Sequence, residues 1–254
     1  MRFVLIHGGF HGAWCWSTTV PELERLGHDA LAIDMPGHGE QVGVESTAAG
    51  RLDAVRSVLQ AGDVLVGHSG GGFDITIAAD AAPELVSHVI YLAAALPREG
   101  RTYPEALTQR DGDVDTAAAV DEVTGMLQYL TFDADGGMRW VDVRGAHTLF
   151  YNDCDEATAR WAFDQLCPEY VGDTASKAVT VPRFWAADLP RSFIRCEQDH
   201  AQPRWLADLV AKRLGVEPLV IDASHSPLLS RPRELAELLV HATTTTPTGP
   251  LIPE

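Results

Sequence analysis

Short apolar runs alternate with amphipathic segments over the first 95 residues of the chain. Because continuous apolar runs fit strands that are covered on both faces, we expect strands at residues 3–6, 30–34, 64–67 and 88–95. The segments between them carry apolar residues at helical spacing, and helices are expected near residues 20–26, 47–60 and 70–82. This alternation predicts a parallel sheet with crossover helices.

The pattern changes at about residue 97 and returns at about residue 190. The intervening segment is rich in Asp, Ala and aromatic residues, with helical stretches near 117–129 and 157–165 but no strong strand. Strands at 193–196 and 218–222 and helices at 205–214 and 233–242 then resume the first pattern. We therefore expect an α/β core of residues 1–96 and 190–242 with a helical cap inserted at 97–189. The tail 243–254, with its threonine run and three prolines, is expected to be disordered.

Composition limits the classes of function. A chain of 254 residues, 46% hydrophobic, can bury a core without a disulfide or a metal ion. A net charge of −17 disfavours nucleic acid and anionic membranes as partners, because like charges repel. The four cysteines form no CxxC pair and lie near no histidine at metal-ligand spacing, so neither zinc nor a redox dithiol is indicated. We expect no metal and no cofactor. No signal peptide or membrane span is recognisable, which predicts a cytoplasmic protein.

The sequence Gly67-His68-Ser69-Gly70-Gly71 matches G-x-S-x-G, the nucleophile elbow of α/β hydrolases. An apolar strand leads into the motif and a helix leads out of it, as this turn requires. A phosphate-binding loop is the alternative, but no P-loop lysine follows and the glycines lack dinucleotide-binding spacing. Ser69 is therefore the predicted nucleophile.

Acyl transfer places negative charge on a carbonyl oxygen, so two backbone N–H groups are needed to stabilise it. One is expected from Gly70, which follows the nucleophile. The other comes from the loop after the first strand, where we favour Gly9; the amide of Phe10 stays open as the alternative.

The general base is expected after the last strand. Of ten histidines, His225 fits, because it follows strand 218–222 after a short loop and comes last in the order Ser, acid, His. The acid belongs on the loop after the preceding strand, where Asp199 is favoured because it lies farther into the loop, and Glu197 is the alternative.

Beyond these residues, the chain resembles the plant methylesterase and hydroxynitrile lyase family and its bacterial relatives, including pyrethroid-type ester hydrolases. The resemblance covers nearly the whole chain, up to about residue 242. Its shared motifs are HGGxHGAWxW at 7–16, GH at 27–28, VGHSxGG at 66–72, QLCPE at 165–169, CEQD at 196–199, SHSP at 224–227 and SRP at 230–232.

Two departures concern the lyase reaction. The resemblance implies that hydroxynitrile lyases carry a threonine in the loop after the first strand and a lysine directly after the base. Those positions are here Gly8 and Ser226. Without the lysine no cation stabilises a departing cyanide, so ester hydrolysis is favoured.

The expected substrate is a small-to-medium apolar or aromatic ester bound between sheet and cap. A lactone or C–C bond hydrolase with the same triad, and a ligand-binding receptor of this fold, are the alternatives. Dimers occur among relatives of this kind, and the sequence leaves a homodimer open. The candidate substrate-contacting residues are Phe10, His11, Trp14, His68, Leu96, Tyr129, Phe132, Phe150, Tyr151 and Trp161.

Overall fold

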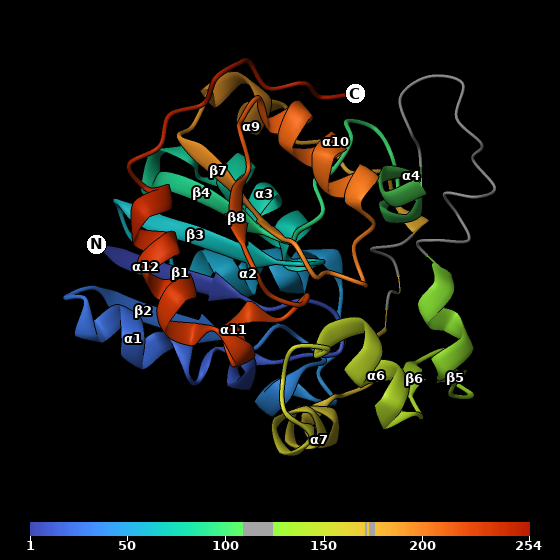
Figure 1. The fold of residues 1–254 in the computed structure, drawn as a ribbon. Helices are drawn as coiled ribbons and strands as arrows, with labels where there is room; N and C mark the ends of the chain where they lie inside the picture. The colour runs from blue at the N-terminus through green and yellow to red at the C-terminus, as the bar shows by residue number, and fades with distance from the viewer. Residues whose placement is uncertain (109–123, 171, 173–175) are drawn as a thin grey trace.

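The computed structural model describes residues 1–108, 124–170, 172 and 176–254 and confirms the predicted parallel sheet (Figure 1). Six strands pair in the order β2-β1-β3-β4-β7-β8, and every neighbouring pair is parallel. The strands are β1 (Arg2–Ile6), β2 (Asp29–Ile33), β3 (Asp63–His68), β4 (Val86–Leu92), β7 (Arg191–Cys196) and β8 (Leu219–Ile221).

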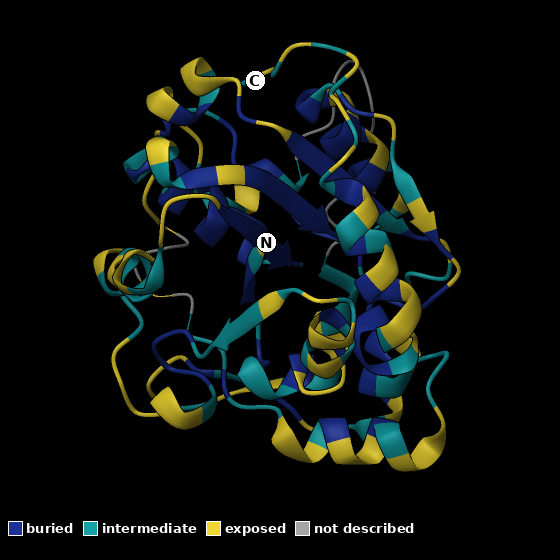
Figure 2. Cartoon of the chain, turned by 90° about the vertical axis from the view of Figure 1, so that its left-hand side faces the viewer, coloured by how far each residue is buried: buried dark blue, intermediate teal, exposed yellow. Residues whose placement is uncertain are grey.

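Helices cover both faces of this sheet. On β1, Phe3 and Leu5 pack into the cluster that holds Leu23 of α1 and Leu239 of α12. The alternate side chains of β1 face the other way, toward the helices α2, α3 and α10. Burial of both faces explains the continuous apolar runs of the central strands, which are mostly dark in Figure 2, while the helices carry exposed outer faces. The helices are α1 (Thr19–Arg25), α11 (Pro227–Ser230) and α12 (Pro232–Ala242) on one side, and α2 (Ala48–Val58), α3 (Gly71–Ala81), α9 (Pro182–Ala187) and α10 (Arg204–Leu214) on the other.

The segment between β4 and α9, which we call the cap, contains more than helices. A short antiparallel hairpin of two three-residue strands pairs Leu130 with Trp140, in a segment where we expected helical stretches and no strong strand. A tight turn closes the hairpin, with Gly136 at a φ of +86° and its N–H donating to the Asp133 carbonyl. Of the helices predicted here, 157–165 is confirmed, 125–129 forms a 3-10 helix, and 117–123 lies outside the described residues. The cap elements are α4 (Tyr103–Thr108), η4 (Gly125–Tyr129), β5 (Leu130–Phe132), β6 (Met138–Trp140), α6 (Val143–Phe150) and α7 (Glu156–Gln165).

The C-terminal tail is bound along the core, so the expectation of disorder is wrong. Two buried guanidinium groups need acceptors, and carbonyl groups of the tail supply them. Arg191 donates to the Gly249 carbonyl at 2.9 Å, and Arg213 donates to the carbonyls of Pro253 at 2.9 Å and Glu254 at 3.1 Å. None of the described helices has the length and apolar character to cross a bilayer.

The strand order places two loops side by side at the carboxyl edge of the sheet. Strand β1 lies between β2 and β3 in the sheet. After β1 the chain forms β2 on one side of it and then crosses over to form β3 on the other side. Ile6 pairs with Gly67 at the ends of β1 and β3, and the loops that follow both strands therefore begin next to each other. In open α/β sheets, ligands bind at such a topological switch point.

Candidate active site

Ser69 lies in the turn between β3 and α3. Its φ is +53°, in the left-handed region that residues other than glycine rarely adopt. Its N–H donates to the Leu92 carbonyl at 3.1 Å, and its own carbonyl accepts from Ala95 at 3.0 Å and Gly72 at 3.1 Å. A backbone conformation of this kind costs about 1–3 kcal/mol and persists where the surroundings fix it. These bonds hold Ser69 in the wall of a cavity above the sheet edge.

His225 and Asp199 are hydrogen-bonded to each other at that same edge. Nδ1 of His225 donates to Oδ2 of Asp199 at 2.8 Å, and both side chains are buried. Oδ1 of Asp199 accepts from the N–H groups of Ala201 at 2.7 Å and Gln202 at 2.8 Å. With its proton on Nδ1, a neutral His225 has Nε2 available as a proton acceptor. His225 and Ser69 line the same cavity.

Glu197, the alternative acid, lies outside the cavity. Its carboxylate forms ion pairs with Arg195 at 2.8 Å and with Arg204 at 3.2 Å. The guanidinium groups of Arg195 and Arg204 thus bind the Glu197 carboxylate at the protein surface. The structure thus brings Asp199, and not Glu197, to His225.

His68 packs against His225 and does not line the cavity. Its Nε2 donates to the backbone carbonyl of His225 at 2.8 Å, and the two rings are 4.8 Å apart. Burial, followed by the charges of His225 and His11, holds the pKa of His68 well below its ordinary value. A neutral ring here supports the His225 loop through this hydrogen bond and adds no positive charge next to His225.

Two buried histidines fix successive peptides of the loop after β1. Nδ1 of His7 donates to the Gly8 carbonyl at 2.7 Å, and Nδ1 of His11 donates to the Gly9 carbonyl at 2.8 Å. The Tyr151 hydroxyl donates to Nε2 of His11 at 2.7 Å, which requires an unprotonated acceptor. Burial is the main reason that the pKa of His11 falls to about 4, so the ring is neutral at neutral pH.

The backbone N–H of Phe10, the alternative oxyanion donor, is already bound to the cap. Phe10 has a φ of +65°, its N–H donates to Oε2 of Glu169 at 2.9 Å, and its carbonyl accepts from the Cys167 N–H at 2.9 Å. The neighbouring Gly9 and Gly70 both line the cavity beside Ser69. A Cβ at Gly70 would lie 3.7 Å from the Gly9 nitrogen, so these two residues are adjacent.

Glu169 is a buried charged residue that the sequence analysis assigned no role. Its Oε2 also accepts from Nε2 of His38 at 2.9 Å. Although burial raises the pKa of Glu169, the hydrogen bond and charge of His38, the charge of Arg51 and the Phe10 N–H lower it to about 2. The side chain is therefore a carboxylate at neutral pH. The only signal in the sequence was the QLCPE motif, which indicates family resemblance and no chemistry.

The cavity has a volume of about 510 Å³ and a largely apolar wall. Ser69, His225, Gly9 and Gly70 line it at the sheet edge. A volume of this size suits a small-to-medium organic ligand. The apolar wall comes from α3, the cap and α10, and includes Phe73, Ile77, Met126, Leu130, Met138, Phe150 and Leu206.

One part of the wall holds a buried ion pair that no sequence pattern predicted. Nε and Nη2 of Arg51 donate to the two carboxylate oxygens of Asp74 at 2.8 Å and 2.7 Å, between α2 and α3. Burial lowers the pKa of Arg51, but the charge of Asp74 and the hydrogen bonds between the two side chains raise it further, so that it lies above its ordinary value. Tyr103 lies close by, with its hydroxyl 3.2 Å from where a Cβ of Gly70 would be. Burial, then the charges of Glu169 and Asp74, raise the pKa of Tyr103, so the hydroxyl keeps its proton.

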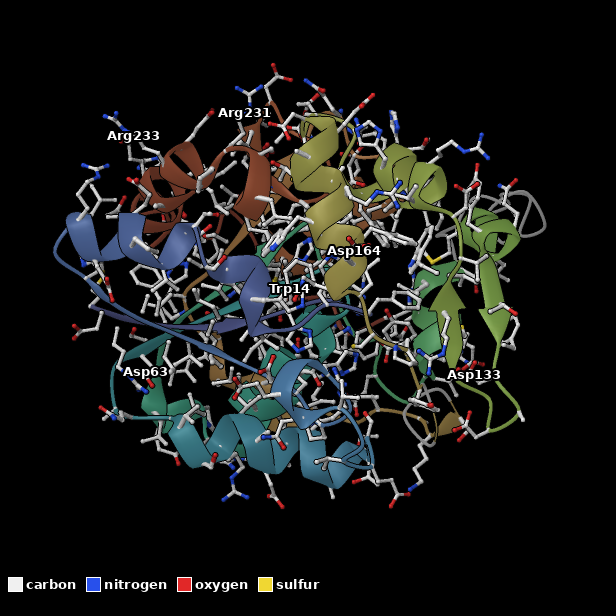
Figure 3. All side chains as sticks on the ribbon, turned by 90° about the horizontal axis from the view of Figure 1, so that it is seen from below. Trp14, Asp63, Asp133, Asp164, Arg231 and Arg233 are labelled. Atoms are coloured by element: carbon white, nitrogen blue, oxygen red, sulfur yellow. The ribbon has the colours of Figure 1, made fainter. Side chains whose placement is uncertain are left out.

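Of the candidate substrate-contacting residues, Phe10 and Phe150 line the cavity. Trp161 is 42% exposed on the outside of α7 with its ring against Trp14, which Figure 3 shows beside the helix that carries Asp164. Phe132 is 61% exposed on the cap hairpin. The other candidates do not line this cavity. The residues outside the cavity lining are His11, Trp14, His68, Leu96, Tyr129, Phe132, Tyr151 and Trp161.

No candidate metal site emerges from the part of the chain that the structure describes. Within it, no group of three or more His, Cys, Asp or Glu side chains is arranged to hold a metal ion. The four cysteines are free thiols. The polar groups that gather around Ser69 are a hydroxyl, an imidazole and backbone amides.

Comparisons with known proteins show which family and fold the chain shares. The model of the alpha/beta hydrolase family matches residues 3–238. The rice protein "Probable esterase PIR7A" (Oryza sativa) is 30% identical over 94% of this chain and 95% of its own length. "Norfluorocurarine synthase 2" of Strychnos sp is 27% identical over 95% of both chains. Among solved structures, a pyrethroid hydrolase from Sphingobium faniae JZ-2 has a TM-score of 0.78 at 23% identity, covering 96% of this chain and 97% of its own.

Proposed function

Because the chain belongs to the α/β-hydrolase family, which its match over residues 3–238 establishes, we propose that it hydrolyses carboxylic esters through an acyl-enzyme. The observation that carries this proposal is the hydrogen-bonded pair of His225 and Asp199 on the cavity that also contains the strained Ser69. The names of relatives such as "Probable esterase PIR7A" support the same reaction class.

In the first half of the reaction, Nε2 of His225 takes the proton of the Ser69 hydroxyl, and Oγ attacks the ester carbonyl. The amides of Gly9 and Gly70 donate to the oxyanion that forms. Asp199 keeps the proton of His225 on Nδ1 and stabilises the imidazolium. The C–O bond of the ester breaks when His225 returns the proton to the leaving alcohol.

In the second half, water replaces the alcohol. His225 takes a proton from this water, whose oxygen attacks the acyl carbon, and the same two amides stabilise the second oxyanion. The bond to Ser69 then breaks, Ser69 regains its proton from His225, and the carboxylic acid leaves. No cofactor takes part in these steps.

The proposed substrate is a neutral ester with apolar or aromatic groups. Apolar side chains such as Phe73, Met138 and Phe150 form most of the cavity wall, and burial of apolar surface drives binding there. Two ion pairs lie in the wall, Asp74 with Arg51 and Glu169 with His38. The carboxylates of Asp74 and Glu169 would repel a carboxylate on the substrate, which favours neutral substrates.

Cyanohydrin cleavage is disfavoured by the loop after β1. A Cβ on Gly8 would lie 2.7 Å from the Cβ of Ser69, so the threonine expected of a hydroxynitrile lyase does not fit beside this nucleophile. The residue after His225 is the buried Ser226, which offers no cation for cyanide.

The test is turnover of p-nitrophenyl butyrate by the wild type and by Ser69→Ala. We expect a burst of p-nitrophenol equal to the enzyme concentration, followed by a slower steady state, and loss of both in Ser69→Ala. Wild-type-like turnover by the variant would refute the proposal. Mass spectrometry of the acid-quenched wild type should detect the acyl group on Ser69.

A further inference from the structure

The cap segment Cys167–Glu169 binds both backbone groups of Phe10, which lies on the loop after β1. The Cys167 N–H donates to the Phe10 carbonyl, and the Phe10 N–H donates to Oε2 of Glu169, each at 2.9 Å. Phe10 has a φ of +65°, which a residue with a Cβ adopts only where its surroundings require it. The backbone conformation at Phe10 thus depends on the cap.

That conformation determines how Gly9 is presented. The peptide between Gly9 and Phe10 is bound at both ends, its carbonyl by Nδ1 of His11 at 2.8 Å and its N–H by Glu169. A planar peptide held at both ends cannot rotate. The N–H of Gly9 belongs to the preceding peptide, whose carbonyl accepts from His7 at 2.7 Å. His7, His11 and Glu169 thus bind the Gly8 carbonyl, the Gly9 carbonyl and the Phe10 N–H. The N–H of Gly9 is then the amide of this loop that can donate into the cavity.

Glu169 is suited to this role by its placement and its charge. Its Oε2 would lie 2.9 Å from a Cβ at position 9, so a side chain there would displace the carboxylate from its present place. The same oxygen faces Nε2 of His38 at 2.9 Å, while Nδ1 of His38 faces the Pro36 carbonyl at 3.1 Å. Both partners of this ring are acceptors, which matches a ring with protons on both nitrogens. His38 thereby compensates the carboxylate and fixes its direction.

We propose that Glu169 is a positioning residue for ester hydrolysis, which from the cap holds Phe10 so that the Gly9 amide points at the oxyanion. This inference rests on the proposed function, because an oxyanion forms there only if acyl transfer takes place. Its effect belongs to the transition state: kcat and the affinity for tetrahedral adducts depend on Glu169, and KM does not.

The experiment compares Glu169→Ala, Glu169→Gln and Glu169→Asp with the wild type, using p-nitrophenyl butyrate. A fluorophosphonate titrates the active sites, and an alkyl trifluoromethyl ketone, which adds to a serine as a tetrahedral adduct, reports on the oxyanion hole. Loss of one oxyanion donor lowers kcat by about 10²–10³-fold, so a misdirected donor should cost about 10–100-fold per titrated site. We expect the ketone to bind weaker by the same factor in Glu169→Ala, with KM changed less than about threefold.

The order of the other two variants separates positioning from charge. Gln keeps the length and an acceptor oxygen, whereas Asp keeps the charge and is one methylene too short. Positioning predicts that Glu169→Gln is the more active of the two; the reverse order would refute it. The matched control is Asp133→Ala, which breaks an exposed cap ion pair with Arg139 at the periphery (Figure 3) and should behave as the wild type.

Two failures can be told apart. If Ser69→Ala retains turnover, the proposed function is wrong. If Ser69→Ala is inactive but the Glu169 variants keep kcat per titrated site and ketone affinity, Glu169 serves only to stabilise the fold, and this inference alone is overturned. The order of Glu169→Gln and Glu169→Asp decides the question even if Glu169→Ala does not fold.

Discussion

Asp199 binds His225 with one carboxylate oxygen and two backbone N–H groups with the other. The amides of Ala201 and Gln202 therefore hold the Asp199 carboxylate in place independently of the imidazole. Because these amides hold the far oxygen, the oxygen at 2.8 Å from Nδ1 stays directed at the base. The acid is thus rigid, and the orientation of the imidazole depends on it.

Replacing Asp199 with Asn should leave the fold intact and reduce kcat. The amide nitrogen would face Nδ1 as a donor, which favours the wrong tautomer of His225, and a loss of about 10³–10⁴-fold is expected from this mechanism. Steady-state kinetics with p-nitrophenyl butyrate measure it. The matched control is Glu197→Gln, on the same loop but paired with Arg195 and Arg204, which should keep wild-type kcat. The opposite pattern would make Glu197 the acid.

The sheet and the residues at its carboxyl edge could be predicted because local signals specify them. Strands buried on both faces appear as unbroken apolar runs, and the loops after them inherit their place from the sheet. Ser69, Asp199 and His225 each follow such a strand directly. Their approximate positions therefore follow from strand order alone, and the structure brings His225 and Asp199 into contact.

The cavity wall could not be predicted, because it depends on how whole elements pack. The aromatic residues Tyr129 and Trp161 looked suitable for a binding site, but composition does not tell which side of a cap helix faces inward. Trp161 points outward, while Arg51 and Asp74 face the cavity from α2 and α3. Glu169 meets Phe10 across 159 positions of the chain, a contact that only the tertiary fold creates.

The ion pair of Arg51 and Asp74 should be sensitive to loss of one partner. Their side chains are only 16% and 7% exposed, so Asp74→Ala leaves a buried guanidinium without its counter-charge. We expect the free energy of unfolding, measured with urea, to fall by about 3–5 kcal/mol. The double variant Arg51→Met/Asp74→Leu removes both charges and should lose less. Glu237→Ala, which breaks an exposed pair with Arg233, is the control and should change stability by less than about 1 kcal/mol.

Gly8→Ala should damage the site through contact with the nucleophile. The added Cβ would meet the Cβ of Ser69 at 2.7 Å and its Oγ at 3.3 Å, so the elbow or the loop after β1 must shift. Overpacking of this kind costs about 1–3 kcal/mol of stability, and a displacement of the nucleophile lowers kcat by about 10²-fold. Gly125→Ala, where no atom lies within 4 Å, is the control for added volume. If the kinetics of Gly8→Ala were unchanged, the turn that carries Ser69 would be able to shift without affecting catalysis, and the prediction would be wrong.

Acid should destabilise the protein well before its carboxylates are protonated, because its buried histidines resist protonation. Burial is the main cause that lowers the pKa of both His11 and His88 to about 4, with the charge of Arg191 adding to the effect at His88. In the unfolded chain both should titrate near 6.5. Between pH of about 6.5 and about 4, the unfolded state therefore binds more protons than the folded state, and the free energy of unfolding falls as the pH is lowered.

The contribution of one histidine to this slope can be measured separately. Each histidine adds at most about 1.4 kcal/mol per pH unit within that window and nothing above it. His88 lies on β4 and binds the Ser192 hydroxyl at 2.8 Å, away from the cavity lining, so His88→Gln can preserve the contact without a titrating ring. Urea unfolding at several pH values gives the free energy of unfolding as a function of pH. We expect this free energy to fall less steeply with decreasing pH in His88→Gln, by at most the amount that one histidine contributes, and the variant should keep wild-type esterase activity at pH 7. Equal slopes in the two proteins would mean that His88 is protonated in the folded state as easily as in the unfolded chain.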